Sequence, residues 1–203
     1  MIRILPFRQY DENDVINLFA LGDAYVNENV TGSDYGDAGV FVTVSEGNLD
    51  LDPVSYADNA YLGKTNYPHV GANQYPSVNL KVKPATAGDS LLGLTLRQTA
   101  KYDENGEKLL YNRQKAEELQ CMLPGQAVPV LSKGVIEIAA TAYDGDLTVG
   151  GGLKLSAGVS GTVTGCSVTD SARIGMVLGT GSRTSGNTAD QFAGTTALIA
   201  LGL

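Results

Sequence analysis

Two short runs, Val135-Ile-Glu-Ile-Ala139 and Gly152-Leu-Lys-Leu-Ser156, determine which fold class the sequence predicts. Each alternates apolar and other residues, as a half-buried β-strand does, and glycine-rich turns separate it from its neighbours. Four more runs of this kind occur in the same region, at residues 127–131, 161–164, 173–178 and 196–201. Strands this short and closely spaced predict a small C-terminal β-barrel or sandwich over residues 126–203.

Two details of this region carry further predictions. Pro129 lacks a backbone N–H, so we expect it at a sheet edge or a bulge. Residues 179–188 are polar and rich in glycine, serine and threonine, so we expect an exposed, mobile loop.

The middle of the chain, residues 32–125, predicts a β-rich lobe. A strand is indicated at residues 40–44, and a longer one at residues 90–102. Asn105-Gly106 predicts a tight hairpin turn into a return strand at residues 107–112. A short helix is expected at residues 113–122, ended by Leu-Pro-Gly.

Residues 55–80 within this lobe resist assignment to helix or strand. Four tyrosines recur there, and tyrosine suits loops that pack over a core or contact a partner. Both interpretations stay open. The tyrosines are Tyr56, Tyr61, Tyr67 and Tyr75.

The first 31 residues predict an extended N-terminal arm followed by a short helix. Pro6 disfavours helix at Leu5, and the apolar residues around it have no obvious partners nearby in the sequence. Asp11 is a candidate cap for a helix over residues 11–21, which Gly22 would end. We expect the removal of residues 1–10 to leave a folded protein.

The amino-acid composition limits the classes of function that the protein can have. The 203 residues carry a net charge of −8, and the first sixty hold eleven acidic residues against two arginines. This acidity disfavours binding to nucleic acid or to an anionic membrane. No apolar signal peptide begins the chain and no run of eighteen apolar residues occurs, so we expect synthesis in the cytoplasm and a soluble product. Cys121 and Cys166 are expected to be reduced rather than paired.

No pattern in the sequence predicts a catalytic residue, a cofactor or a metal site. His69 is the only histidine, and no Gly-x-Ser-x-Gly motif accompanies it. The glycines of residues 150–152 and 179–181 lack the Gly-Lys-Ser/Thr of a phosphate loop and are expected in turns. Five loop aspartates offer oxygen ligands for calcium, although a solvated acidic face is the simpler interpretation. They are Asp34, Asp37, Asp50, Asp52 and Asp58.

Several stretches of the chain resemble the capsid decoration (cement) proteins of tailed bacteriophages. The likeness is carried by Leu92-Gly-Leu-Thr-Leu-Arg-Gln-Thr99, by Tyr102-Asp-Glu-Asn-Gly-Glu107, and by the twelve residues from Leu123 to Gly134. The later patterns Gly-Gly-Leu-Lys-Leu, Gly-Thr-Val-Thr-Gly, Arg-Ile-Gly-Met-Val-Leu-Gly and Ala-Leu-Ile-Ala-Leu are similar to the small β-barrel of such proteins. The beginning, Pro6-Phe-Arg-Gln-Tyr-Asp-Glu-Asn-Asp-Val15, is similar to their arm.

This resemblance implies a non-enzymatic protein of the virion that binds the capsid exterior and bridges neighbouring major capsid proteins. It also implies a homo-oligomer, a dimer or a trimer, with no cofactor. An apolar arm can bury itself by adding a strand to the sheet edge of another protein. The candidate capsid-binding residues are therefore Ile2, Ile4, Leu5, Pro6, Phe7, Arg8 and Tyr10.

Three other functions stay open on the sequence alone. A tail or fibre component of a virion uses similar small β domains. A carbohydrate-binding or calcium-dependent adhesion module would show saturable glycan binding or a melting temperature that falls with chelator. An enzyme would need an activity that His69→Ala abolishes.

Overall fold

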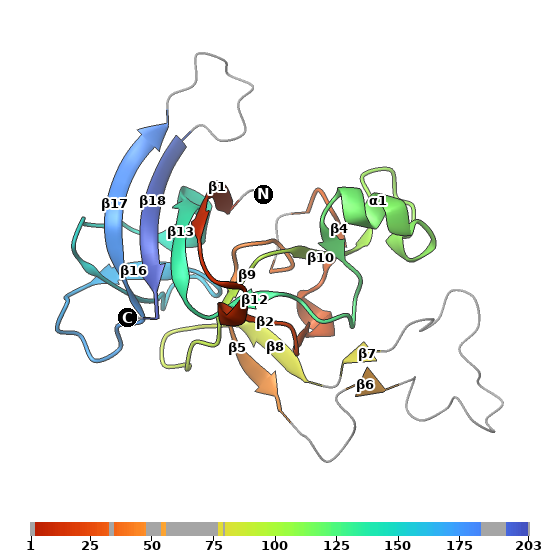
Figure 1. Cartoon of the computed structure of the whole chain (residues 1–203), viewed down its shortest axis with the longest axis horizontal. Helices are drawn as coiled ribbons and strands as arrows, with labels where there is room; N and C mark the ends of the chain where they lie inside the picture. The colour runs from red at the N-terminus through yellow and green to blue at the C-terminus, as the bar shows by residue number, and fades with distance from the viewer. Residues whose placement is uncertain are drawn as a thin grey trace.

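The computed structural model describes residues 3–32, 35–47, 54–55, 77–78, 80–183 and 194–202. Within these ranges the chain is mainly β, as the sequence predicts, with a single α-helix and four short 3-10 helices. Its strands form two large sheets and two small ones (Figure 1). Both large sheets are open, so the described residues form a sandwich-like arrangement rather than a closed barrel.

The seven-stranded sheet is built mostly from the C-terminal runs. Alternation along its strands points Ile136 and Ile138 into the core and turns Glu137 to the other face. All neighbours are antiparallel except the last pair. In spatial order the strands are β1 (Ile4–Gln9), β13 (Gly134–Ala139), β18 (Gly194–Leu201), β17 (Gly175–Arg183), β15 (Gly152–Leu155), β16 (Val163–Cys166) and β14 (Tyr143–Asp144).

The six-stranded sheet is apolar on both faces. Phe41 packs into the core that this sheet shares with the seven-stranded sheet, whereas Val42 packs into a second cluster with Val82 and Val130. Burial on both faces explains the three successive apolar residues at positions 40–42, whereas Val44 is exposed. In spatial order the strands are β2 (Val15–Ile16), β12 (Val130–Leu131), β9 (Gly93–Thr95), β5 (Phe41–Glu46), β8 (Lys81–Pro84) and β3 (Ala20–Leu21).

A smaller unit packs beside these sheets around the helix α1 (Arg113–Glu118). Its parallel three-stranded sheet has the order β11 (Cys121–Met122), β10 (Gln98–Tyr102) and β4 (Asn27–Asn29). Ala100, Leu109, Ala116 and Leu123 form its apolar cluster. The remaining strands, β6 (Val54–Ser55) and β7 (Ser77–Val78), pair with each other.

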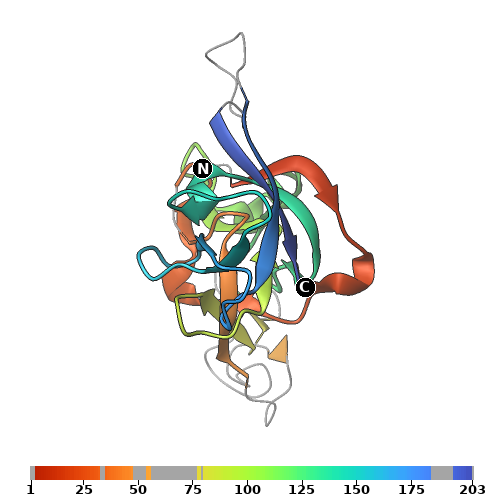
Figure 2. The same ribbon diagram turned by 90° about the vertical axis from the view of Figure 1, so that its left-hand side faces the viewer.

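Two neighbouring segments join the large sheets. The N-terminal segment supplies β1 to the seven-stranded sheet and then β2 to the six-stranded sheet. The second segment supplies β12 to the six-stranded sheet and then β13 to the seven-stranded sheet. Ser132 donates hydrogen bonds from its backbone N and its Oγ to the carbonyl of Asp14 where the two segments cross. Figure 2 shows the red N-terminal segment running along one side of the molecule. The predicted segments 1–31, 32–125 and 126–203 therefore do not correspond to separate sheets.

The predicted helix over residues 11–21 is wrong. Asp11 does act as a cap, because its Oδ1 accepts a hydrogen bond from the N–H of Asn13, but the helix that follows is the single 3-10 turn η1 (Glu12–Asp14). The next residues pair with β12 as β2, and β3 pairs with β8. Tertiary strand pairing therefore overrides a weak helical pattern. A second 3-10 turn, η2 (Asp23–Tyr25), follows.

The predicted hairpin around Asn105-Gly106 is confirmed at its turn, but the predicted return strand at residues 107–112 is wrong. Gly106 has a φ of +82°, and Asp103 Oδ1 accepts hydrogen bonds from the N–H groups of Asn105 and Glu107. Only Lys108 forms a bridge back to Tyr102, after which the chain enters the 3-10 helix η3 (Leu109–Tyr111). The predicted strand at residues 90–102 is interrupted between β9 and β10, and α1 is shorter than expected.

Five of the six C-terminal runs are confirmed as the strands β13, β15, β16, β17 and β18. In the sixth run, residues 127–131, only the last two residues form a strand, which is β12. Pro129 directly precedes β12, which lies between two strands, so the expectation of an edge or bulge is wrong. The 3-10 helix η4 (Ala140–Ala142) follows β13. β17 continues to Arg183, so residues 179–183 of the predicted loop are strand, and residues 184–188 lie outside the described residues.

Other predictions also fall outside the described residues. These are Ile2, His69, the aspartates Asp34, Asp50, Asp52 and Asp58, and the tyrosines Tyr56, Tyr61, Tyr67 and Tyr75. In the described part of the chain, no helix is long and apolar enough to cross a membrane.

Candidate partner-binding surface

The two ends of β1 differ in burial. Ile4 and Leu5 are 8% and 1% exposed and pack inside their own chain, whereas Phe7 is 53% exposed and Tyr10, just after the strand, is 37% exposed. Pro6 and Arg8 are also exposed. The prediction that the N-terminal apolar residues lack a partner in their own chain is thus wrong for Ile4 and Leu5, because β13 supplies one.

β1 lies at the end of the seven-stranded sheet, and within the described ranges no other strand pairs with its outer side. Its register to β13 changes from Ile4–Ile138 to Arg8–Ile136, so Leu5, Pro6 and Phe7 lie opposite the single residue Glu137. This bulge accommodates Pro6, which has no N–H for the ladder. The bulge also limits the regular exposed edge to the residues after it, Arg8 and Gln9.

Two hollows lie between β1 and the smaller unit, with volumes of about 310 and 490 Å³. Both are lined by Arg8, Leu96, Arg97 and Gln120, so they adjoin each other; together they are called the β1 groove. The first hollow extends to Arg3 and Asp37, and the second extends to Tyr10, Glu12 and Pro129.

Arg3 and Asp37 fix one end of the groove. Arg3 Nε lies 3.9 Å from Asp37 Oδ2, and the Asp37 side chain is only 3% exposed. Asn27 Nδ2 donates a hydrogen bond to Asp37 Oδ1, and Asn27 Oδ1 accepts one from the N–H of Gly36. Burial lowers the pKa of Arg3, and the charge of Asp37 opposes that shift. These contacts tie the chain just before β1 to β4 and its following loop.

Nε and Nη1 of Arg3 are buried and donate no hydrogen bond within the described ranges. Leaving a buried polar group without a partner costs about 1–3 kcal/mol. These two nitrogen atoms of Arg3 therefore add an energetic cost at the base of the groove.

Gln120 forms the opposite wall with a left-handed backbone, at a φ of +50°. It follows the last turn of α1, at a position where glycine is the usual residue. Gln98 Nε2 donates a hydrogen bond to the carbonyl of Leu119, which holds this turn against β10. Among the described residues, Gln120 is the only residue other than glycine with a positive φ.

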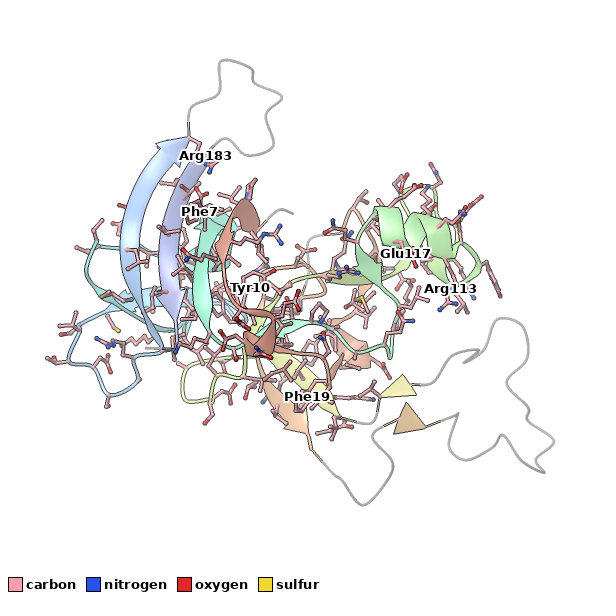
Figure 3. All side chains as sticks on the ribbon, viewed as in Figure 1. Phe7, Tyr10, Phe19, Arg113, Glu117 and Arg183 are labelled. Carbon is pink, nitrogen blue, oxygen red and sulfur yellow. The ribbon has the colours of Figure 1, made fainter. Side chains whose placement is uncertain are left out.

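A third hollow of about 140 Å³ adjoins Arg97 on the side of α1. Arg113 and Glu117 of the helix line it together with Cys121. Figure 3 shows Arg113 and Glu117 on α1, with Phe7 and Tyr10 on the other side of the molecule's centre along β1. Arg97 is therefore the residue at which all three hollows meet.

The described residues contain no group of three or more histidine, cysteine, aspartate or glutamate side chains placed to bind a metal ion. Cys121 and Cys166 are free thiols. Burial raises the pKa of Cys121 to about 11 and also raises the pKa of Cys166. Raised thiol pKa values are opposite to those of nucleophilic cysteines.

Sequence reasoning identified the exposed half of this surface, Phe7, Arg8 and Tyr10, but missed Leu96, Arg97 and Gln120. Leu96 and Arg97 were missed because a continuous strand was predicted over residues 90–102, in which they would be regular strand positions. One available signal was the concentration of arginine in an acidic chain, since Arg3, Arg8, Arg97 and Arg113 are four of its six arginines.

Comparison with known proteins gives no relative: no family model, curated protein or solved structure matches this chain.

Proposed function

We propose that the protein is a non-enzymatic structural protein of a virion, which binds the exterior of a bacteriophage capsid and bridges neighbouring major capsid proteins. The resemblance of residues 91–134 to capsid decoration proteins supports this class. The observation that supports this attachment surface is the exposure of Phe7 and Tyr10 in and just after the second half of β1; Arg8 and Tyr10 also line the β1 groove.

The position of β1 supports a binding role. An edge strand presents backbone N–H and C=O groups that another chain can pair with, and an adjacent exposed aromatic side chain adds apolar area to bury. Phe7 is half exposed on that edge, and burying a phenylalanine contributes roughly 1.5–3 kcal/mol. A contact of this size needs several copies on a shell to give firm attachment.

The proposed role implies copies distributed over the whole shell, with the protein itself in dimers or trimers. Reconstruction of particles that carry the protein tests this directly. Density over every capsomer is the expected result. Density restricted to one vertex would overturn the proposal in favour of a tail component.

A co-sedimentation assay with shells assembled without the protein tests the surface. Phe7→Ala is expected to weaken attachment more than Arg8→Ala, because hydrophobic burial outweighs an exposed ion pair worth about 0–1 kcal/mol. Val149→Ala is the matched control, since Val149 is 58% exposed and lies in a turn away from β1. Equal attachment of the wild type and Phe7→Ala would overturn the assignment of this surface.

A further inference from the structure

The β1 groove is positively charged in a protein that is otherwise acidic. Arg3, Arg8 and Arg97 line it against Asp37 and Glu12, although the whole chain carries a net charge of −8. Asp37 lies opposite Arg3. Within the described ranges, neither Arg8 nor Arg97 has an ion-pair partner within 4.0 Å. Two exposed guanidinium groups at the centre of the groove therefore have no ion-pair partner among the described residues.

We propose that the β1 groove binds an acidic, extended peptide segment of the shell protein, whose carboxylates pair with Arg8 and Arg97. This inference rests on the proposed function for the source of the segment. It adds the chemistry that the segment must present, namely carboxylate side chains spaced along a strand.

The lining of the groove matches such a segment. A guanidinium group presents planar N–H donors that pair with both oxygens of one carboxylate, so arginine selects this group by geometry as well as by charge. Leu96, Tyr10 and Pro129 add apolar surface between and beside the arginines. β1 contributes Arg8 to the groove and is the end strand of its sheet, so the backbone groups of Arg8 and Gln9 are available for pairing. A peptide with alternating acidic and apolar side chains engages all three features.

A polyanion fits less well. The groove has only one more arginine than carboxylates, and a nucleic acid carries about one charge for every 1.7 Å of duplex. Glu12 at the rim and the net negative charge of the chain repel so dense an array of phosphates. Arg8 and Arg97, which have no ion-pair partner among the described residues, can pair with one or two carboxylates.

The central variant is Arg97→Glu, because Arg97 borders all three hollows. Lys108→Glu is the matched control: Lys108 is exposed, lies outside the groove lining and makes no ion pair with a described residue. Arg97→Lys keeps the positive charge but removes the planar guanidinium group that can pair with both oxygens of a carboxylate. Thermal unfolding of each variant verifies that the fold is intact before binding is measured.

Binding is measured by fluorescence anisotropy with a labelled, end-capped peptide of alternating glutamate and valine. The same peptide with glutamine in place of glutamate is the ligand control, and co-sedimentation with shells is the second readout. Arg97→Glu replaces an attraction to the carboxylates by a repulsion, so it is expected to weaken both by about tenfold, more than loss of an exposed ion pair alone, while Lys108→Glu changes them by less than about twofold. Arg97→Lys should lie in between, and about 0.5 M salt should weaken wild-type binding.

Each contrary result has a distinct meaning. Equal binding of the glutamine peptide, or undiminished binding by Arg97→Glu, would overturn the inference. Free glutamate that competes as well as the peptide would make the groove a small-anion site, and preference for an oligonucleotide would make it a polyanion site; both also overturn it. Failure of the wild type to co-sediment with shells, with peptide binding intact, would instead overturn the proposed function.

Discussion

Ile4 of β1 lies opposite Ile138 of β13 in antiparallel register, and both side chains are buried in the core that the two large sheets share. Three residues later, Phe7 is 53% exposed. The first half of the N-terminal strand thus packs into the core, and its second half is exposed on the surface. Substitutions within this one strand can therefore separate the stability of the fold from the proposed attachment.

Leu5→Ala is expected to lower the free energy of unfolding by about 2–5 kcal/mol, because Leu5 is only 1% exposed and its removal leaves a cavity. Phe7→Ala, two positions away, should change it by about 0.5 kcal/mol. Urea unfolding followed by circular dichroism measures both. A large loss from Phe7→Ala would show that Phe7 packs against its own chain in solution.

Removal of residues 1–10 should unfold or strongly destabilise the protein, contrary to the expectation from sequence. The truncation deletes β1, its pairing with β13, and two core side chains. Thermal unfolding of the truncated chain checks this. A cooperative transition at the wild-type temperature would mean that β1 contributes little to the core.

The sequence predicted local patterns better than it predicted long-range pairing. The C-terminal strands and the turn at Asn105-Gly106 were predictable, because alternation and turn chemistry are local. The strand identity of β1 and β2 was not, since their partners lie more than 110 residues away. A run such as Ile2-Arg-Ile-Leu-Pro appears partnerless when only its neighbours in sequence are considered.

The candidate surface was predictable only in part for the same reason. Arg8 and Tyr10 were identified near the beginning of the chain, but only the fold brings them into one groove lining with Arg97 and Gln120. Gln120 gave no signal in sequence, because its left-handed backbone depends on how the turn after α1 is held by Gln98.

Arg183→Met is expected to lower the free energy of unfolding by about 1–3 kcal/mol. Arg183 Nε donates to Glu137 Oε1 at 3.1 Å and its Nη2 donates to Oε2, while the side chain of Glu137 is only 11% exposed. The substitution leaves a nearly buried carboxylate without its partner. Figure 3 shows Arg183 at the end of β17, where it links that strand to β13.

The double variant Arg183→Met with Glu137→Leu should recover most of that loss, because an apolar pair removes the unpaired charge. Urea unfolding of the two single variants and the double variant gives the coupling energy. Additive losses would show that the two side chains do not interact in solution.

Lys115→Met should reduce stability at neutral pH but have little effect in acid. Lys115 Nζ lies 2.8 Å from Asp103 Oδ2 and 2.9 Å from Glu104 Oε1, and these contacts lower the pKa of both carboxyl groups and raise the pKa of Lys115. Because the carboxyl pKa values are lowered by folding, their stabilisation is present above the unfolded values of about 4 and is lost as pH falls through the folded values.

The difference in unfolding free energy between the wild type and Lys115→Met should therefore shrink steadily as the pH falls below about 4. Lys108→Met, which removes a lysine without an ion pair to a described residue, is the control and should show no such trend. A difference that stays constant down to pH 2 would mean that the lysine acts through packing alone.

Cys166 should react with a thiol reagent well before Cys121 in the native protein. Cys121 is 6% exposed and its pKa is raised to about 11 by burial, so very little of its thiolate forms at pH 8. Cys166 is partly exposed on β16. Titration with Ellman's reagent should show one fast thiol, which Cys166→Ser removes, and a second that reacts only in denaturant. Two equally fast thiols would show that the cluster of Ala100, Ala116 and Leu123 around Cys121 opens readily in solution.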